Sequence, residues 1–89
     1  MPVAYAILSR KWADRLHIHQ FMVRKERRGS GVGDTLMSGL LERYSNDPVS
    51  LKVDRHNDGA IRFYSRYGFA MADVEDGNAW MWRNLGVRR

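Results

Sequence analysis

A basic cluster followed by a run of glycines is the feature of this 89-residue sequence that points most directly to chemistry. Four of the five residues in Arg24-Lys25-Glu26-Arg27-Arg28 are basic, and Gly29-Ser30-Gly31-Val32-Gly33 follows at once. Glycines let a backbone turn with its N–H groups pointing inward, and a helix that begins there adds the positive end of its dipole. This combination is typical of a phosphate cradle. A glycine-rich turn in a basic surface loop is the alternative.

The glycine run differs from two common phosphate-binding signatures. No Gly-Lys-Ser or Gly-Lys-Thr follows it, which excludes a Walker loop. The dinucleotide fingerprint requires a third glycine, and Asp34 occupies that position. Another class of phosphate site is therefore expected.

Hydrophobic patterning predicts the elements that must hold this loop in place. Short apolar runs indicate strands, and apolar residues spaced three and four apart indicate helices. Strands are predicted at residues 3–8, 16–23, 49–53, 69–74 and 79–83, and helices at residues 32–46 and 57–67. Turns are expected at residues 10–15 and at Asp76-Gly77. The order β-β-α-β-α-β-β predicts an α/β fold of the mixed α+β kind.

Length and composition favour one small domain, residues 1–89. The chain has no cysteine and three histidines, so we expect no metal site. No window is apolar enough to span a membrane, and the start lacks the basic region of a signal peptide. A cytoplasmic location without a membrane partner is therefore expected.

The net charge of +5 is concentrated in the first third of the chain. Residues 1–33 carry seven basic and two acidic side chains, whereas residues 34–89 carry eight of each. Such a patch favours nucleic acid, a membrane surface or a phosphorylated small molecule as partner. Nucleic acid is disfavoured, because a duplex requires a dispersed basic surface and this charge lies at one loop.

Two separate motifs resemble those of one enzyme family. Arg28, Gly31 and Gly33 match the pattern Arg/Gln-x-x-Gly-x-Gly/Ala, and residues 57–69 match Asn-x-x-Ala-x-x-Phe/Leu-Tyr-x-x-x-Gly-Phe. These are the two signatures of the GNAT N-acetyltransferase superfamily, in the same order and at similar spacing. The sequence thus resembles this superfamily over nearly its whole length.

The resemblance implies a central mixed sheet in which two parallel strands splay apart. In the family the pantetheine arm of acetyl-CoA enters this gap as a pseudo-strand. Family members usually begin with a strand, two helices and another strand before the hairpin expected here at residues 3–23. We therefore expect a short form, truncated at the N-terminus, that lacks one wall of the acceptor site.

The resemblance also implies which residues bind acetyl-CoA, the expected co-substrate. The second strand would hold the pantetheine arm, and the amides of the glycine loop would hold the pyrophosphate. Lys25, Arg27 and Arg28 would supply positive charge, while Asn57 would contact the cofactor arm and cap the second helix. The implied cofactor-binding residues are Phe21, Met22, Val23, Arg28, Gly29, Ser30, Gly31, Val32, Gly33, Asp34 and Asn57.

Two side chains are predicted to be catalytic, Tyr64 and His19. Tyr64 occupies the family position that donates a proton to the departing sulfur, and a phenol is neutral at pH 7; a core aromatic is the alternative. The second strand carries no carboxylate that could act as general base. By two-residue periodicity His17 and His19 share one face with Phe21 and Val23. His19 is favoured as the base because it lies nearer the expected thioester, with a structural histidine as the alternative.

These features predict an N-acetyltransferase that acetylates a primary amine, with a protein lysine as the favoured acceptor. The alternatives are a non-catalytic acyl-CoA-binding module and a basic nucleic-acid-binding protein. The strand at residues 3–8 is expected to form an unpaired, apolar sheet edge. We therefore expect a homodimer through the first hairpin, or docking of a macromolecular acceptor onto that side.

Overall fold

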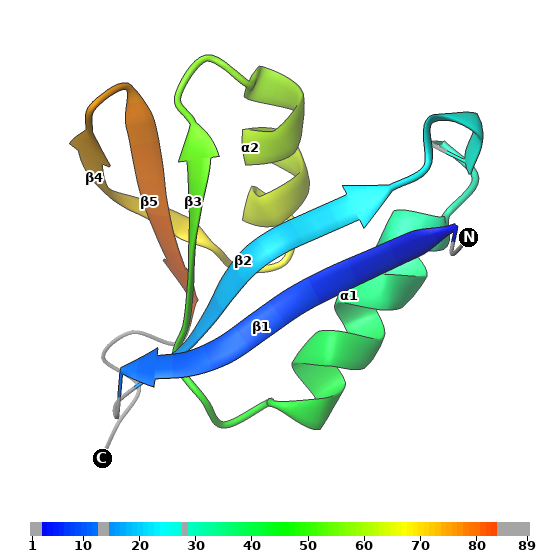
Figure 1. Ribbon diagram of the computed structural model, residues 1–89, viewed down its shortest axis with the longest axis horizontal. Helices are drawn as coiled ribbons and strands as arrows, with labels where there is room; N and C mark the ends of the chain where they lie inside the picture. Colours follow the sequence, from blue (N-terminus) through cyan, green and yellow to red (C-terminus); the bar gives the residue numbers. More distant parts are fainter. Residues whose placement is uncertain (1–2, 13–14, 28, 84–89) are drawn as a thin grey trace.

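The expected order of helices and strands is present in the structure (Figure 1). A computed structural model describes residues 3–12, 15–27 and 29–83. The strands described are β1 (Ala4–Trp12), β2 (Arg15–Val23), β3 (Val49–Asp54), β4 (Ala70–Glu75) and β5 (Asn78–Arg83). The helices are α1 (Val32–Arg43) and α2 (Asp58–Ser65), with a short 3₁₀-helix, η1 (Lys25–Arg27), before α1.

The strands form one mixed sheet in the order β1-β2-β3-β5-β4. The parallel pair β2 and β3 is hydrogen-bonded only at its start, where residues 16–18 lie beside residues 49–51. Beyond this point the two strands diverge, as Figure 1 shows. The splayed parallel pair implied by the family resemblance is thus confirmed.

A β-bulge in β2 lies at the point of divergence. Ile7 of β1 pairs with Gln20, but the next residue, Leu8, pairs with Ile18. His19 is therefore an extra residue in β2. An extra residue shifts the alternation of side chains, so residues before and after it no longer follow one two-residue rhythm.

The predicted grouping of His17 and His19 with the end of the strand is consequently wrong. Phe21, after the bulge, packs on Phe63 of α2, with ring centroids 5.6 Å apart. His17, before the bulge, points to the opposite face, where its Nδ1 lies 2.7 Å from Ser50 Oγ. Both of these polar side chains are buried, and the hydrogen bond offsets the cost of removing them from water.

The hydrophobic core lies between one face of the sheet and the two α-helices. In Figure 1 the β1–β2 hairpin crosses in front of α1. Half-buried side chains of α2 and β1 pack against the core cluster and extend it. Its buried members are Leu16, Ile18, Met37, Leu40, Leu41, Val49, Leu51, Phe69 and Met81.

β1 and α1 end elsewhere than the sequence predicts, whereas the turn between β4 and β5 is where it was expected. β1 continues to Trp12, into the segment predicted as a turn, because an edge strand tolerates polar residues on its solvent side. α1 ends at Arg43, before the predicted limit, and the N–H of Tyr44 closes its last turn on Leu40 O. Asp76-Gly77 joins β4 to β5 with positive φ at both residues, as predicted for a tight hairpin.

β1 forms one edge of the sheet, as expected, and β4 forms the other. Large apolar side chains on β1 and the facing part of β2 are 40–48% exposed. They are Tyr5, Ile7 and Met22, and Val3 directly precedes them. This hairpin therefore presents apolar surface beside unpaired backbone groups.

The central strand β3 should be the most sensitive part of the fold. Leu51 is 2% exposed, and replacing it with alanine should lower the free energy of unfolding by about 2–5 kcal/mol, through lost burial and the cavity left behind. Val74→Ala on edge strand β4, where the side chain is 44% exposed, should cost about 0.5 kcal/mol or less. Urea denaturation of both variants checks this prediction, and equal losses would contradict the core described above.

Candidate functional site

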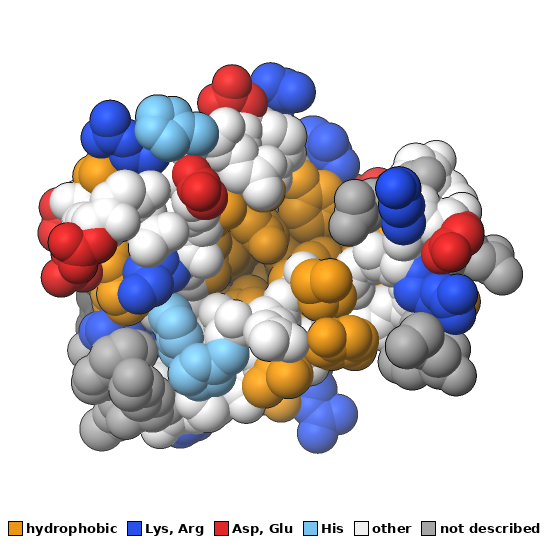
Figure 2. Space-filling view, turned by 45° about the horizontal axis from the view of Figure 1, so that its top comes forward, with side chains coloured by type: hydrophobic (Ala, Val, Ile, Leu, Met, Phe, Trp, Pro, Cys, Tyr) orange, Lys and Arg blue, Asp and Glu red, His pale blue; other side chains and the backbone are white. Residues whose placement is uncertain are grey.

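A cavity of about 620 Å³ opens where β2 leaves β3. Figure 2 shows a hollow with apolar side chains at its floor in this region. Three segments line the cavity: the end of β2, the glycine loop with the start of α1, and one side of α2. The lining residues are Phe21, Met22, Val23, Gly29, Gly31, Gly33, Asp34, Asn57, Gly59, Ala60, Phe63, Tyr64 and Arg66.

The glycine loop presents the N-terminus of α1 to the cavity. Gly29 and Gly31 have φ of +84° and +87°, a left-handed conformation that side chains rarely adopt. Gly31 is the N-cap of α1, and its carbonyl accepts a hydrogen bond of 3.0 Å from Thr35 Oγ1. The first N–H groups of a helix have no intrahelical partner, so this end of the cavity suits an anion.

At Gly33 the requirement is space. A Cβ at this position would lie 3.3 Å from Val23 Cγ2 and 3.6 Å from the Phe63 ring. The missing side chain lets α1 approach both β2 and α2 closely. This close approach brings the glycine loop and α2 together around one cavity.

The end of β2 supplies backbone groups along the cavity. Residues 21–23 pair with β1 on one side. The pairing of β2 with β3 on the other side ends earlier, at Ile18. The backbone of this segment therefore has one edge toward the cavity that it helps to line. Such an edge can hydrogen-bond to an extended, amide-bearing chain.

Asn57 both caps α2 and lines the cavity. Its Oδ1 accepts a hydrogen bond of 3.1 Å from the N–H of Ala60. The predicted capping role is therefore present, and it does not remove the side chain from the cavity.

Tyr64 fits both of the alternatives that the sequence left open, a core aromatic and a side chain at the site. Its ring packs edge-on against Phe21 and Phe69, at centroid distances of 6.2 and 6.0 Å, and it also lines the cavity. Burial raises the pKa of the Tyr64 hydroxyl above its usual value near 10. The phenol therefore stays protonated at neutral pH and can donate a proton.

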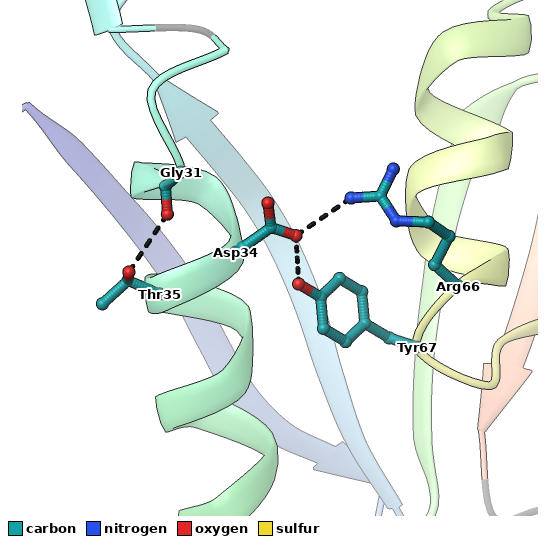
Figure 3. A network of polar contacts seen from close by, with 5 residues as sticks. All are labelled: Gly31, Asp34, Thr35, Arg66 and Tyr67. Carbon is teal, nitrogen blue, oxygen red and sulfur yellow. Dashed lines mark hydrogen bonds and ion pairs between the residues drawn. The ribbon is translucent and has the colours of Figure 1, made fainter.

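A polar network joins α1 to the end of α2, as Figure 3 shows, and two of its members, Asp34 and Arg66, line the cavity. Asp34 Oδ1 accepts a hydrogen bond of 2.9 Å from Arg66 Nη2 and another from the Tyr67 hydroxyl. These two donors, Tyr67 first, lower the pKa of the Asp34 carboxyl from its usual value. Asp34 is therefore a carboxylate at neutral pH.

The structure brings most of the predicted cofactor-binding residues to this cavity. Ser30 and Val32 instead line a smaller hollow of about 460 Å³ beside the start of β1, and Gly31 lines both. Arg28 lies outside the described residues. The described cavity lining does not include Lys25. Arg66 was missed from the sequence because it fills an unspecified position of the second motif, between Tyr64 and Gly68.

His19 lies apart from the cavity lining. Its side chain is exposed, its Nε2 is 2.6 Å from Ser9 Oγ, and its ring meets that of His17 edge-on at 4.9 Å. These contacts place it on the face opposite the α-helices, at the point where β2 and β3 diverge. The face is therefore not the one predicted, and the role of His19 as general base stays a prediction.

Residues 3–12, 15–27 and 29–83 lack two kinds of feature. No group of three or more histidine, aspartate or glutamate side chains there could hold a metal ion. None of the helices in these ranges is long and apolar enough to cross a membrane.

Comparison with known proteins gives consistent matches. A model of the acetyltransferase (GNAT) family matches residues 2–69. An uncharacterised N-acetyltransferase of Methanocaldococcus jannaschii is 31% identical over 85 residues, which cover 85% of this chain and 38% of that protein.

Two solved structures are also similar. Ard1 of Thermoplasma volcanium is 35% identical with a TM-score of 0.79, over 91% of this chain and 62% of its own. Naa50 of Arabidopsis thaliana, in complex with the bisubstrate analogue CoA-Ac-MVNAL, is 25% identical with a TM-score of 0.70, over 89% and 61%.

This chain thus spans less than two thirds of each of these proteins. The family model nevertheless matches more than half of it, and described residues of both sequence signatures line one cavity. The chain belongs to the GNAT family of acetyltransferases.

Proposed function

We propose that this protein binds acetyl-CoA in the cavity between β2, α1 and α2 and transfers the acetyl group to a primary amine. The observation that carries the proposal is that one cavity is lined both by the end of β2, beyond its pairing with β3, and by the N-terminus of α1. Pantetheine is an extended amide-bearing chain, and pyrophosphate is an anion. The cavity offers a suitable surface to each.

The fit of acetyl-CoA follows from groups already described. The backbone of residues 21–23 would pair with the pantetheine amides, because this segment lines the cavity beyond the point where β2 separates from β3. The amides at the start of α1 would bind the pyrophosphate, since a side chain at Gly31 would stand in open space at this approach and glycine leaves that space free. Asn57 would contact the arm between these two ends.

In the proposed reaction, acetyl-CoA supplies a thioester whose carbon–sulfur bond breaks as the amine nitrogen bonds to the acetyl carbon. Tyr64 would donate its proton to the departing sulfur, since its hydroxyl is neutral and lines the cavity. His19 would accept the amine proton from the opposite face, where the strands diverge. Ser9 would orient the imidazole through its hydrogen bond to Nε2.

The proposed acceptor is an amine on a peptide or protein, with a lysine side chain favoured. Naa50 was solved with an analogue that joins CoA to a peptide. On this chain, the exposed apolar residues Tyr5, Ile7 and Met22 flank His19 along the first hairpin. An exposed apolar surface suits a macromolecular acceptor better than a small metabolite, which needs enclosure to be oriented.

Acetyl-CoA should raise the melting temperature of the protein. At a hundredfold excess over Kd the added stability is about 2.7 kcal/mol. Gly31→Val should abolish the shift, because a β-branched residue resists the positive φ and crowds the anion site. Gly77→Val is the control, since this glycine has the same sign of φ but lies in the β4–β5 turn. An unchanged melting curve of the unmutated protein would refute the proposal.

Tyr64→Phe should lower kcat for amine acetylation by about 10²–10⁴-fold while KM for acetyl-CoA stays nearly constant. Only the proton donated to sulfur is lost, since the ring that packs on Phe21 is kept. Tyr44→Phe is a matched control, because this tyrosine packs against the core at the end of α1 and does not line the cavity. Steady-state kinetics measure both effects.

His19→Asn provides the contrasting variant for the second proton. A general base contributes a similar 10²–10⁴-fold, so kcat should again fall without weaker acetyl-CoA binding. If Tyr64→Phe or His19→Asn leaves turnover unchanged, the proton assigned to that residue is transferred by another group or by water. A thermal shift with acetyl-CoA but no acetylation of any amine would favour the non-catalytic acyl-CoA-binding module.

The open edge of β1 leads us to propose a homodimer through the first hairpin. Sedimentation at tens of micromolar should show a dimer, because an unpaired edge with apolar side chains pairs readily with a second edge. Ile7→Lys should shift the species to monomer, and Met71→Lys on the β4 edge is the control. A strict monomer that acetylates no protein in a lysate would exclude both the dimer and a docked protein acceptor.

A further inference from the structure

The cavity contains two charged side chains among its described lining residues, Asp34 and Arg66. CoA carries several phosphate charges, so the source of positive charge at this cavity matters for binding. The basic cluster at residues 24–28 was expected to provide it, yet Lys25 does not line the cavity, and Arg24 pairs with Glu26 at 3.3 Å. Arg66 is the cation that the described part of the chain places there.

Arg66 is held by contacts on two sides of its guanidinium group. On one side, Nη2 donates to Asp34 at 2.9 Å. On the other, the guanidinium carbon lies 5.3 Å from the centroid of the Phe63 ring and 6.0 Å from that of Tyr67. Cation–π contacts and a charged hydrogen bond together restrict a side chain that is otherwise 60% exposed.

Asp34 is an unexpected neighbour for an anion site. A carboxylate repels a phosphate, so its presence in the first turn of α1 weakens anion binding unless its charge is offset by a neighbouring cation. Its Oδ1 accepts from both Arg66 and the Tyr67 hydroxyl, which ties it to the end of α2 (Figure 3). The negative charge is therefore paired with the cation that faces the cavity.

We propose that Arg66 binds a phosphate group of CoA and that Asp34 is the positioning residue that holds Arg66 at the cavity. The inference rests on the proposed function, since it takes CoA as the ligand. A guanidinium group has five N–H donors, so Arg66 can keep its bond to Asp34 and still donate to phosphate. Tyr67 holds the shared carboxylate oxygen from the other side.

Arg66→Ala should weaken CoA binding about tenfold, measured by isothermal titration calorimetry, because one charge-assisted contact to phosphate is lost. Binding of pantetheine, which has no phosphate, should not change. Arg62→Ala is the matched control, since it removes the same charge one turn earlier on α2 from a side chain outside the cavity lining. The pantetheine measurement also shows that each variant is folded.

Two substitutions of Asp34 separate positioning from charge. Asp34→Asn keeps an oxygen that can accept from Arg66 and Tyr67 but removes the negative charge, so CoA affinity should equal or exceed that of the unmutated protein. Asp34→Ala removes the acceptor, so CoA affinity should fall about threefold or more although a repelling charge is gone. In the double variant with Arg66→Ala the losses should not add, because both act through one contact.

The outcomes distinguish this inference from the proposed function. If the unmutated protein binds CoA and Arg66→Ala behaves like Arg62→Ala, the phosphate role of Arg66 is wrong and the proposed function stands. If Asp34→Ala tightens CoA binding as Asp34→Asn does, Asp34 only repels phosphate and positions nothing. Failure of the unmutated protein to bind CoA overturns both proposals.

Discussion

The early end of hydrogen bonding between β2 and β3 is the constraint on which the rest of the structure depends. Two parallel strands that stayed paired would leave no room for a cavity between them along residues 21–23. The bulge at His19 coincides with this end, and it turns Phe21 toward α2. One extra residue thus accompanies both the opening of the sheet and the apolar floor of the cavity.

The fold and the glycine loop could be predicted because their signals are local. Positive φ at Gly31, the Asn57 cap and the turn at Asp76-Gly77 each follow from residue types within a few positions of one another. Strand and helix order follows from hydrophobic period in the same way. Short-range patterns alone do not predict that these local features share one site. That expectation came from the family motifs.

The features that could not be predicted depend on residues far apart in the chain. The bulge at His19 is defined by the pairing of its two neighbours with β1, Ile18 with Leu8 and Gln20 with Ile7. Nothing in residues 16–23 alone breaks the two-residue rhythm. For that reason the face of His19 was predicted wrongly. Arg66 acquires its place at the cavity only through Asp34, 32 positions away, and through the ring of Phe63. A motif that leaves position 66 unspecified contains no sign of this contact.

Positive charge in this chain acts at two ranges, and the structure separates them. The excess in the first third attracts an anion over a distance set by salt screening, which affects the rate of encounter. A cation held against a carboxylate and an aromatic ring acts at contact distance, where its orientation decides which anion binds. A net charge of +5 by itself would suit many polyanions. Under the two proposals, selectivity for one phosphorylated ligand comes from the groups that converge on the cavity, the amides at the start of α1 and Arg66.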